Sequence, residues 1–160
     1  FHVTGVQTCA LPIYFRSNKF YDLTIEGMLN YYRLSIECMI KITNKKGSIG
    51  IICPATLFGD ASATKLRCEI IEMNDIKNIE YLPENSNVFD NITQSTVIFT
   101  LNRGGTTSEI TLKNNRDGTQ MSVNIGLIRR IFPNYEIPFI TSQEWKILEK
   151  ISKFKKIKHI

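Results

Sequence analysis

The sequence predicts an α/β fold built on part of an open sheet. Apolar side chains recur at helical spacing over residues 22–45 and again over residues 60–73. Strand-like runs occupy residues 49–54, 76–82 and 96–101. The order helix, strand, helix, strand, loop, strand is that of half of an open α/β sheet.

The first helix is expected to start at Asp22, whose side chain suits an N-cap. A basic turn and a glycine at residues 44–47 are typical of a helix end. The apolar stripe of this helix consists of Leu29, Tyr32, Ile36, Met39 and Ile40.

The run at residues 49–54 is continuously apolar, which predicts a central parallel strand buried on both faces. Asp60 is expected to cap the second helix. A polar loop separates the strands at 76–82 and 96–101, so we expect two neighbouring strands joined without a helix. The buried stripe of the second helix is placed at Ala63, Leu66, Ile70 and Met73.

The C-terminal part predicts a β-hairpin followed by a helix. Two short strand-like runs flank Asp117 and Gly118, a pair that favours a tight hairpin turn. Thr141 and Glu144 have the spacing of a capping box. The helix that follows carries Trp145, Leu148 and Ile151 on its apolar side.

Composition and charge narrow the class of protein. The 160 residues are 42% hydrophobic, far from the disordered class, and carry a net charge of +5. Positive charge favours a polyanionic partner, although ribosomal, RNA-binding and DNA-binding proteins share it. No apolar run approaches the ~18 residues of a membrane helix, so no membrane association is expected.

Three cysteines, Cys38, Cys53 and Cys68, are widely spaced, and each lies within an apolar pattern. This arrangement favours small buried side chains in a reducing cytoplasm over a zinc site or a disulfide framework. The expected location is therefore cytoplasmic.

Residues 3–13 resemble the in-frame translation of a sequencing-library adaptor. A short apolar strand or a signal-peptide remnant is the alternative, but no positively charged segment precedes the apolar residues. We therefore expect residues 1–13 to be foreign to the protein and to pack poorly, with native sequence missing upstream of Tyr14.

Residues 21–102 resemble the later motifs of the gamma-type N6-adenine DNA methyltransferases of restriction-modification systems. Cys53 stands where valine is usual in the first of three matching pieces, a glycine-strand-proline passage. The three pieces occur in the family's order: residues 45–47 with 51–57, then Leu66 and Arg67, then residues 87–90 with 94–99.

The resemblance implies a partial Rossmann-like methyltransferase sheet, later strands only, with a C-terminal β-hairpin and helix. It divides the chain into the C-terminal half of the catalytic domain, residues 14–102, and a hairpin and linker into a truncated target-recognition domain, residues 103–160. A match of Ile137, Pro138, Glu144 and Trp145 to that linker supports the division.

The resemblance further implies transfer of a methyl group from S-adenosylmethionine to an adenine flipped out of the duplex. The sequence contains neither the Asn/Asp-Pro-Pro-Tyr/Phe motif nor a glycine-rich cofactor motif. No catalytic, cofactor-binding or metal-binding residue is therefore assigned here. The chain as given is expected to be inactive by itself.

Phe89 matches the aromatic residue of the family's eighth motif, which packs against the extruded adenine. Stacking suits that task because it is sequence-tolerant. The alternative is a core side chain that closes a loop onto the sheet. Pro54, Ala55 and Thr56 follow a predicted parallel strand, where open sheets bind ligands, but they would also suit a simple exit from the strand.

The basic residues Lys113, Arg116, Arg129 and Arg130, with the lysines of residues 153–158, are candidates for DNA phosphate contacts. A solvated surface of mixed charge is the alternative. Arg67 either pairs with an acidic neighbour or faces a phosphate.

The expected partners are double-stranded DNA and a restriction nuclease, fused or separate. Two other functions stay open. One keeps the fold and changes the substrate to RNA or a protein glutamine. The other is a non-enzymatic, basic nucleic-acid-binding α/β module. Neighbouring genes would discriminate among them, because a nuclease or specificity subunit next door indicates restriction-modification.

Overall fold

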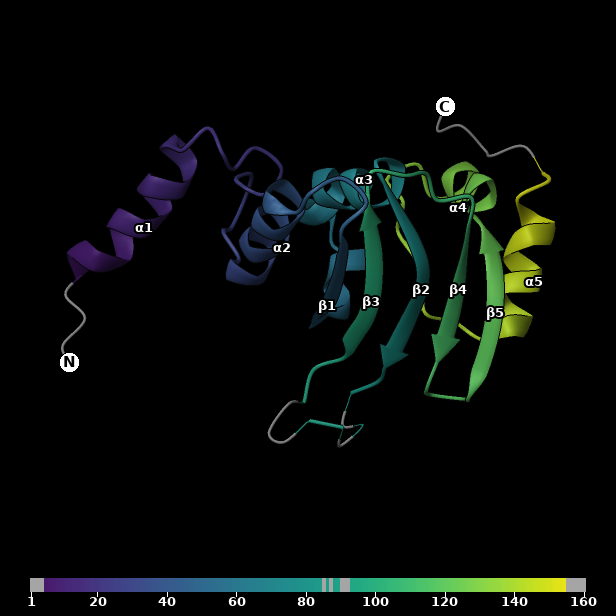
Figure 1. The fold of residues 1–160 in the computed structure, drawn as a ribbon. Helices are drawn as coiled ribbons and strands as arrows, with labels where there is room; N and C mark the ends of the chain where they lie inside the picture. Colours follow the sequence, from purple (N-terminus) through teal and green to yellow (C-terminus); the bar gives the residue numbers. More distant parts are fainter. Residues whose placement is uncertain (1–4, 85, 87, 90–92, 155–160) are drawn as a thin grey trace, which may run out of the picture.

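Five strands form one mixed sheet, with helices packed against it (Figure 1). The computed structural model describes residues 5–84, 86, 88–89 and 93–154 of the chain. In spatial order the strands are β1 (Ser48–Pro54), β3 (Thr96–Arg103), β2 (Asn74–Leu82), β4 (Glu109–Asn114) and β5 (Thr119–Asn124). The helices are α1 (Gly5–Ser17), α2 (Tyr31–Ile42), α3 (Thr64–Glu72), α4 (Ile125–Ile131) and α5 (Ser142–Ile151), with 3-10 turns η1 (Ala55–Phe58) and η2 (Ala61–Ala63). The α/β class is confirmed.

Strand direction sorts the sheet into two sets. β3 runs antiparallel to both β1 and β2, and β4 runs parallel to β2 and antiparallel to β5. β1, β2 and β4 therefore point the same way and finish at one end of the sheet, at the bottom of Figure 1. We call this end the carboxyl end.

β1 corrects one expectation. It is an edge strand among the described strands, it pairs antiparallel to β3, and only one of its faces is buried. Ile49, Ile51 and Cys53 face the core, whereas Gly50 and Ile52 face outward, and Ile52 is 59% exposed. An unbroken apolar run therefore did not indicate burial on both faces here.

One face of the sheet carries the hydrophobic core. The strand side chains alternate in and out, as period-2 geometry requires. α2 packs against β1, and α3 packs against β2. The inward strand residues join apolar residues of α2, α3 and α5 in one cluster, whose largest fully buried apolar members include Phe58, Phe99, Ile36, Ile40, Leu66 and Ile70.

The predicted strands after α3 are confirmed. β2 and β3 are adjacent and antiparallel, and the described residues of the connection 83–95 contain no helix. The β4–β5 hairpin also forms, and Gly118 adopts a positive φ of 69°, which suits glycine. The hairpin joins the same sheet through the β2–β4 pairing, so the sheet crosses the predicted boundary at residues 102 and 103.

The start of the first predicted helix was wrong. α2 begins at Tyr31 with Asn30 as its N-cap, and Asp22 lies in an irregular segment before it. Gly27 in that segment has a φ of 71°, which a helix cannot contain. The predicted end was also wrong, because α2 stops at Ile42. In the turn that follows, the residue with a positive φ is Lys46 and not Gly47.

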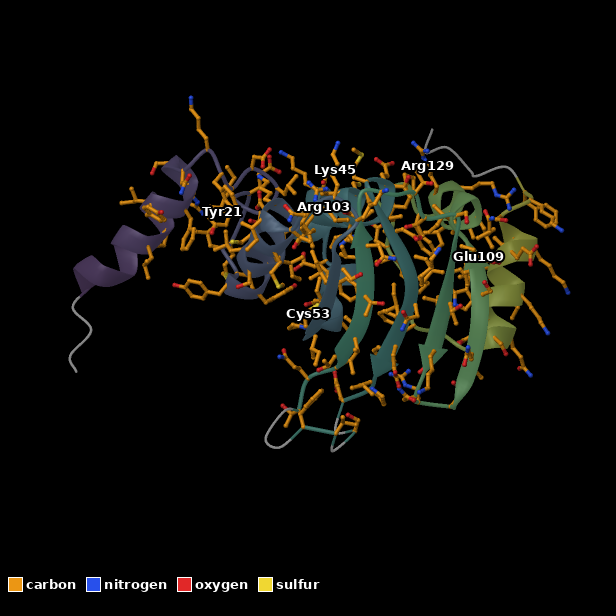
Figure 2. All side chains as sticks on the ribbon, viewed as in Figure 1. Tyr21, Lys45, Cys53, Arg103, Glu109 and Arg129 are labelled. Carbon is orange, nitrogen blue, oxygen red and sulfur yellow. The ribbon has the colours of Figure 1, made fainter. Side chains whose placement is uncertain are left out.

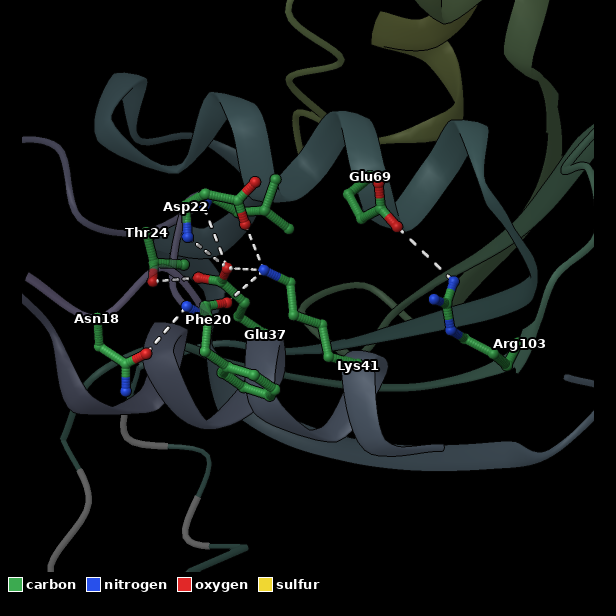
Figure 3. A network of polar contacts seen from close by, with 9 residues as sticks. Asn18, Phe20, Asp22, Thr24, Glu37, Lys41, Glu69 and Arg103 are labelled. Atoms are coloured by element: carbon green, nitrogen blue, oxygen red, sulfur yellow. Dashed lines mark hydrogen bonds and ion pairs between the residues drawn. The ribbon is translucent and has the colours of Figure 1, made fainter. Parts of the chain in front are cut away.

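A buried carboxylate explains why residues 22–24 leave the helical path (Figure 3). The fully buried Glu37 accepts hydrogen bonds from the backbone N–H groups of Asp22 and Leu23, at 2.8 and 3.1 Å, and from the Thr24 hydroxyl at 2.6 Å. Lys41 Nζ lies 2.8 Å from the same carboxylate and also pairs with Asp22. The network holds this segment on α2.

Asp60 acts as a helix cap, as expected, although the turn that it caps is η2, which leads into α3. Its carboxylate accepts a hydrogen bond from Ser62 N at 2.8 Å. Met73 was placed wrongly, because it is 56% exposed and lies just beyond the end of α3.

Of the two C-terminal helices, α5 was predicted from the sequence and α4 was not. α5 starts at the Thr141–Glu144 capping box and buries Trp145, as expected. Ile151 was placed wrongly, since it is 58% exposed. The short α4 was not predicted, although the Asn124 side chain caps it by accepting from Gly126 N at 2.8 Å.

Residues 5–17 form a helix that extends away from the sheet (Figure 1), a structure not expected from the sequence. The side chains of Leu11 and Ile13 are 47% and 66% exposed, in keeping with the poor packing expected there. Its contacts with the rest of the chain come from the last turns, where Phe15 meets Tyr21 and Arg16 binds the Gly27 carbonyl.

The expected burial of the cysteines holds only in part. Cys53 is buried, and burial raises the pKa of its thiol to about 12. Cys38 and Cys68 are half-buried, and all three thiols are free.

Candidate functional site

Three chain segments leave the sheet at the carboxyl end. η1 follows β1, residues 83–95 follow β2, and the turn at residues 115–118 follows β4. Residues from widely separated parts of the sequence therefore meet at one end, the place where open α/β sheets bind ligands.

Pro54, Ala55 and Thr56 lie at this end, as predicted. Pro54 is the last residue of β1, and Ala55 donates its N–H to the Ser95 carbonyl at 3.0 Å. The exit from β1 is thus tied to the end of the 83–95 loop. Ala55 is buried, whereas Thr56 is exposed.

Tyr32 is a residue of this end that the sequence reasoning missed. It lies in the first turn of α2, and its hydroxyl is 3.4 Å from the Thr56 hydroxyl. Burial raises the pKa of Tyr32, so the hydroxyl is protonated at neutral pH. The sequence had placed Tyr32 in an apolar stripe. The available signal was its hydroxyl, since a half-buried tyrosine usually needs a polar partner.

Phe89 lies in the loop that leaves β2 at the carboxyl end. Its side chain is half-buried, and the core cluster of the described residues does not include it. Its neighbour Val88 is 53% exposed. Phe89 and residues 54–56 thus lie at the same end of the sheet. The hydrogen bond from Ala55 reaches Ser95, the last residue of the loop that contains Phe89.

Two of the four named basic residues also lie toward this end. Lys113, near the end of β4, pairs with Glu80 at 2.7 Å. Arg116 lies in the exposed turn after β4. Its guanidinium is 3.4 Å from the Tyr81 hydroxyl and 5.9 Å from the centre of the Tyr81 ring.

Arg129 and Arg130 lie on α4, at the opposite end. Figure 2 labels Arg129 at that end, with Cys53 near the carboxyl end. Arg129 lies 3.6 Å from a Glu72 oxygen and 5.9 Å from the Tyr135 ring centre. Arg130 donates to the Ser152 hydroxyl at 2.9 Å. The four residues do not form one surface. Of the 153–158 cluster, Lys153 is exposed, and residues 155–158 lie outside the described residues.

Arg67 pairs with an acidic neighbour. It is fully buried on α3 and lies 3.7 Å from Glu136. Its guanidinium donates to the carbonyls of Leu57, Asp60 and Asn134 at 2.9, 2.6 and 3.1 Å. Arg67 therefore ties η1 and the segment before α5 to α3, and it does not face a phosphate.

The sequence matches the family model described as N-6 DNA Methylase over residues 16–156. That match includes nearly all of the chain. The chain belongs to the N-6 DNA methylase family. The matched residues include all three motif-like pieces, the β4–β5 hairpin and α5.

Solved structures of restriction-modification proteins resemble this methylase chain. A chain from a type I R-M system is 13% identical with a TM-score of 0.52, and the match covers 76% of this chain and 36% of that one. A modification subunit of a putative type I restriction enzyme from Vibrio vulnificus YJ016 is 18% identical over 52% of this chain and 19% of that one, with a TM-score of 0.47.

The type IIG restriction endonuclease BpuSI is 18% identical, with a TM-score of 0.49, over 70% of this chain and 13% of its own. The methylase chain thus spans 13% to 36% of the lengths of these three proteins. No curated protein sequence matches it.

The methylase sheet is the methyltransferase-like α/β fold that the resemblance implied. Within the described residues, no helix combines the length and apolar character needed to cross a membrane.

Proposed function

We propose that the chain is the later part of the catalytic domain of a site-specific DNA adenine-N6 methyltransferase from a restriction-modification system. Residues 14–102 would complete the catalytic sheet, and residues 103–160 would lead into a target-recognition domain. The substrate is double-stranded DNA, and a nuclease, fused or separate, is the functional partner. The whole enzyme would act in the cytoplasm.

One observation carries this proposal: residues of the first and third family-like pieces come together at the carboxyl end. Residues 54–56 leave β1 there, and the loop of Phe89 connects β2 to β3, the neighbour of β1. A backbone hydrogen bond from Ala55 to Ser95 joins them. In this arrangement Phe89 would stack on an adenine turned out of the duplex. Residues 54–56, with Tyr32 against Thr56, would form the rim of the pocket that receives the base.

S-adenosylmethionine is the proposed methyl donor of the longer enzyme. The glycines of this chain form no glycine-rich turn between a strand and a helix, the feature expected to hold the cofactor. The chain's own residues therefore do not fit the cofactor, and no methyl-transfer step is assigned to them. The 160-residue chain is expected to show no methyltransferase activity.

The first test extends the reading frame upstream of the Tyr14 codon in the source DNA. A glycine-rich strand-turn-helix and an Asn/Asp-Pro-Pro-Tyr/Phe motif are expected within about two hundred residues, the span of a missing catalytic half. A frame that lacks both would overturn the proposal.

The second test measures transfer of tritiated methyl groups from S-adenosylmethionine to duplex DNA by the extended protein. Label is expected in N6-methyladenine, and DNA that already carries this methyl group at the target should accept none. Label in RNA or in a protein glutamine would instead support the other substrates, and no transfer to any of them would favour a binding module.

Phe89→Ala tests the assigned role within the extended protein. Loss of a stacking interaction of ~1–3 kcal/mol should lower DNA methylation by about 5- to 150-fold. Val88→Ala, at the exposed neighbouring position, is the control and should stay within about twofold. Phe89→Tyr keeps the ring and should retain activity. Equal losses in the two alanine variants would mean that Phe89 only closes the loop.

A further inference from the structure

The turn at residues 115–118 is fixed to the end of β2, directly before the loop that carries Phe89. Asn115 donates its backbone N–H to the Tyr81 carbonyl at 3.0 Å, and its side-chain amide binds the same carbonyl at 3.1 Å and Glu80 at 2.8 Å. The turn therefore keeps a defined place at the carboxyl end, although its side chains are exposed.

Arg116 is supported by a layer of aromatic rings. Its guanidinium lies near the Tyr81 ring and hydroxyl, and Tyr81 stacks on Phe139 with ring centres 4.6 Å apart and planes 10° from parallel. Tyr81 is 7% exposed, so this support is rigid. A guanidinium held by an aromatic ring keeps its planar donors available for an oxyanion.

The charge of Arg116 is not neutralised by an ion pair in the part of the chain that the structure describes. Lys113 and Arg129 do have such partners, Glu80 and Glu72. Arg116 is a smaller cause of the lowered pKa of both Asp117 and Glu144. However, an oxygen of Asp117 accepts hydrogen bonds within the turn, and an oxygen of Glu144 accepts them in the helix cap.

The hydrogen bonds of those two carboxylates account for most of their behaviour. Bonds from Thr119 hold the pKa of Asp117 below its usual range, with Arg116 a smaller cause. Bonds from Thr141 do the same for the pKa of Glu144. Arg116 therefore has its charge available to an outside anion.

We propose that Arg116 binds a backbone phosphate of the duplex that delivers the target base to Phe89, whereas Arg129 and Arg130 make no phosphate contact. This inference rests on the proposed function. A base that enters at the carboxyl end brings its flanking phosphates to the same end. Arg129 and Arg130 belong to α4, which lies at the opposite end of the sheet (Figure 1).

The test is the salt dependence of DNA binding by the extended protein, measured by fluorescence anisotropy with a labelled duplex. Each phosphate contact contributes about 0.9 to the slope of log affinity against log salt concentration. Arg116→Gln should reduce that slope by about one contact and raise the KM for DNA severalfold, with kcat nearly unchanged. Arg129→Gln is the matched control and should leave the slope at the wild-type value.

Arg116→Lys distinguishes charge from shape, since it keeps the charge without the planar group. It should retain the wild-type slope and bind DNA less tightly than wild type. All variants are compared at equal folded fraction, established by circular dichroism.

The outcomes separate the two proposals. A wild-type extended protein that neither binds nor methylates DNA would overturn the proposed function. A wild-type protein that does both, together with an Arg116→Gln variant that keeps the wild-type slope, would overturn the Arg116 proposal alone. A slope lowered equally by Arg129→Gln would also overturn it, because the two ends of the sheet would then be equivalent.

Discussion

Replacement of Arg67 by methionine should remove much of the stability of the C-terminal half of the fold. Arg67 is fully buried, and its guanidinium joins η1 to the segment before α5 through the carbonyls of Leu57, Asp60 and Asn134. Burial lowers its pKa, but the pKa of an arginine stays far above neutral, so the group is charged in the fold. Arg67→Met keeps a long apolar stem and removes every one of these donors.

The size of the loss follows from the groups left behind. The Asp60 carbonyl also accepts from Ala63 N, but the carbonyls of Leu57 and Asn134 lose the donor supplied by Arg67. A buried acceptor without its donor costs ~1–3 kcal/mol, which applies to Leu57. Asn134 is exposed, so its carbonyl can bind water and the loss of its hydrogen bond adds only about 1 kcal/mol. Glu136 adds little, because its side chain is 29% exposed and stays hydrated. The expected loss of about 2–4 kcal/mol is a large share of the ~5–15 kcal/mol that holds a domain together.

Urea unfolding followed by the fluorescence of Trp145 measures this loss, because Trp145 is the only tryptophan and is 5% exposed. With a urea dependence of ~1–3 kcal/mol per molar, the midpoint should fall by roughly 1–4 M. Arg129→Met is the control. It removes a cation that is 69% exposed, and it should cost less than about 1 kcal/mol. Equal midpoints for the two variants would show that Arg67 does not tie these segments together.

Three smaller perturbations test other parts of the fold by the same urea assay. Thr141→Ala should cost about 1 kcal/mol through loss of the capping box, and an unchanged midpoint would exclude a role for the cap. Gly118→Ala should cost ~1–2 kcal/mol because its φ is 69°, whereas Gly59→Ala, at a negative φ with free space around it, should be nearly neutral. The hydrogen bond from Lys41 is the main reason that the pKa of Asp22 in the fold lies below its usual value. The ionised Asp22 therefore stabilises the fold at a pH above that usual value, and this stabilisation is lost as the pH falls through the lowered pKa. Asp22→Asn should therefore lower the midpoint slightly at pH 7 and by progressively less as the pH falls below the usual range of an aspartate. A difference that does not change with pH would rule out the ion pair as its cause.

Local patterns predicted the elements whose structure depends on near neighbours. The β4–β5 hairpin follows from Asp117 and Gly118, and the start of α5 follows from Thr141 and Glu144. In both cases the partners are a few residues apart, so sequence spacing alone specifies the hydrogen bonds.

Long-range partners decided the elements that sequence reasoning placed wrongly. α2 starts late because Glu37 draws the backbone of Asp22 and Leu23 away from helical geometry, a contact across about four helical turns of sequence. β1 is open on one face because burial depends on which elements cover a strand, not on its own composition.

The roles of residues 54–56 and Phe89 in the candidate site stay predictions. These segments meet because β1 and β2 point the same way and end together, an arrangement that the sequence reasoning did not specify. The contact of Tyr32 with Thr56 depends on how α2 packs, and the separation of Arg116 from Arg129 depends on where α4 packs. The spacing of residues in the sequence does not predict either.

The position of β3 between β1 and β2 determines the order in which these strands can pair during synthesis. β1 leaves the ribosome first, yet the one strand that pairs with it in the described sheet is β3, which comes after α3 and β2. β2 and β3 can pair at once as neighbours, and β1 then adds to the outer edge of β3. At ~5–20 residues per second, translation of residues 55–103 takes roughly 2–10 s, and during that time β1 can pack against α2 but has no strand to pair with. β3, which lies between the other two strands, is therefore the last of the three to be synthesised, and β1 cannot join the sheet before it.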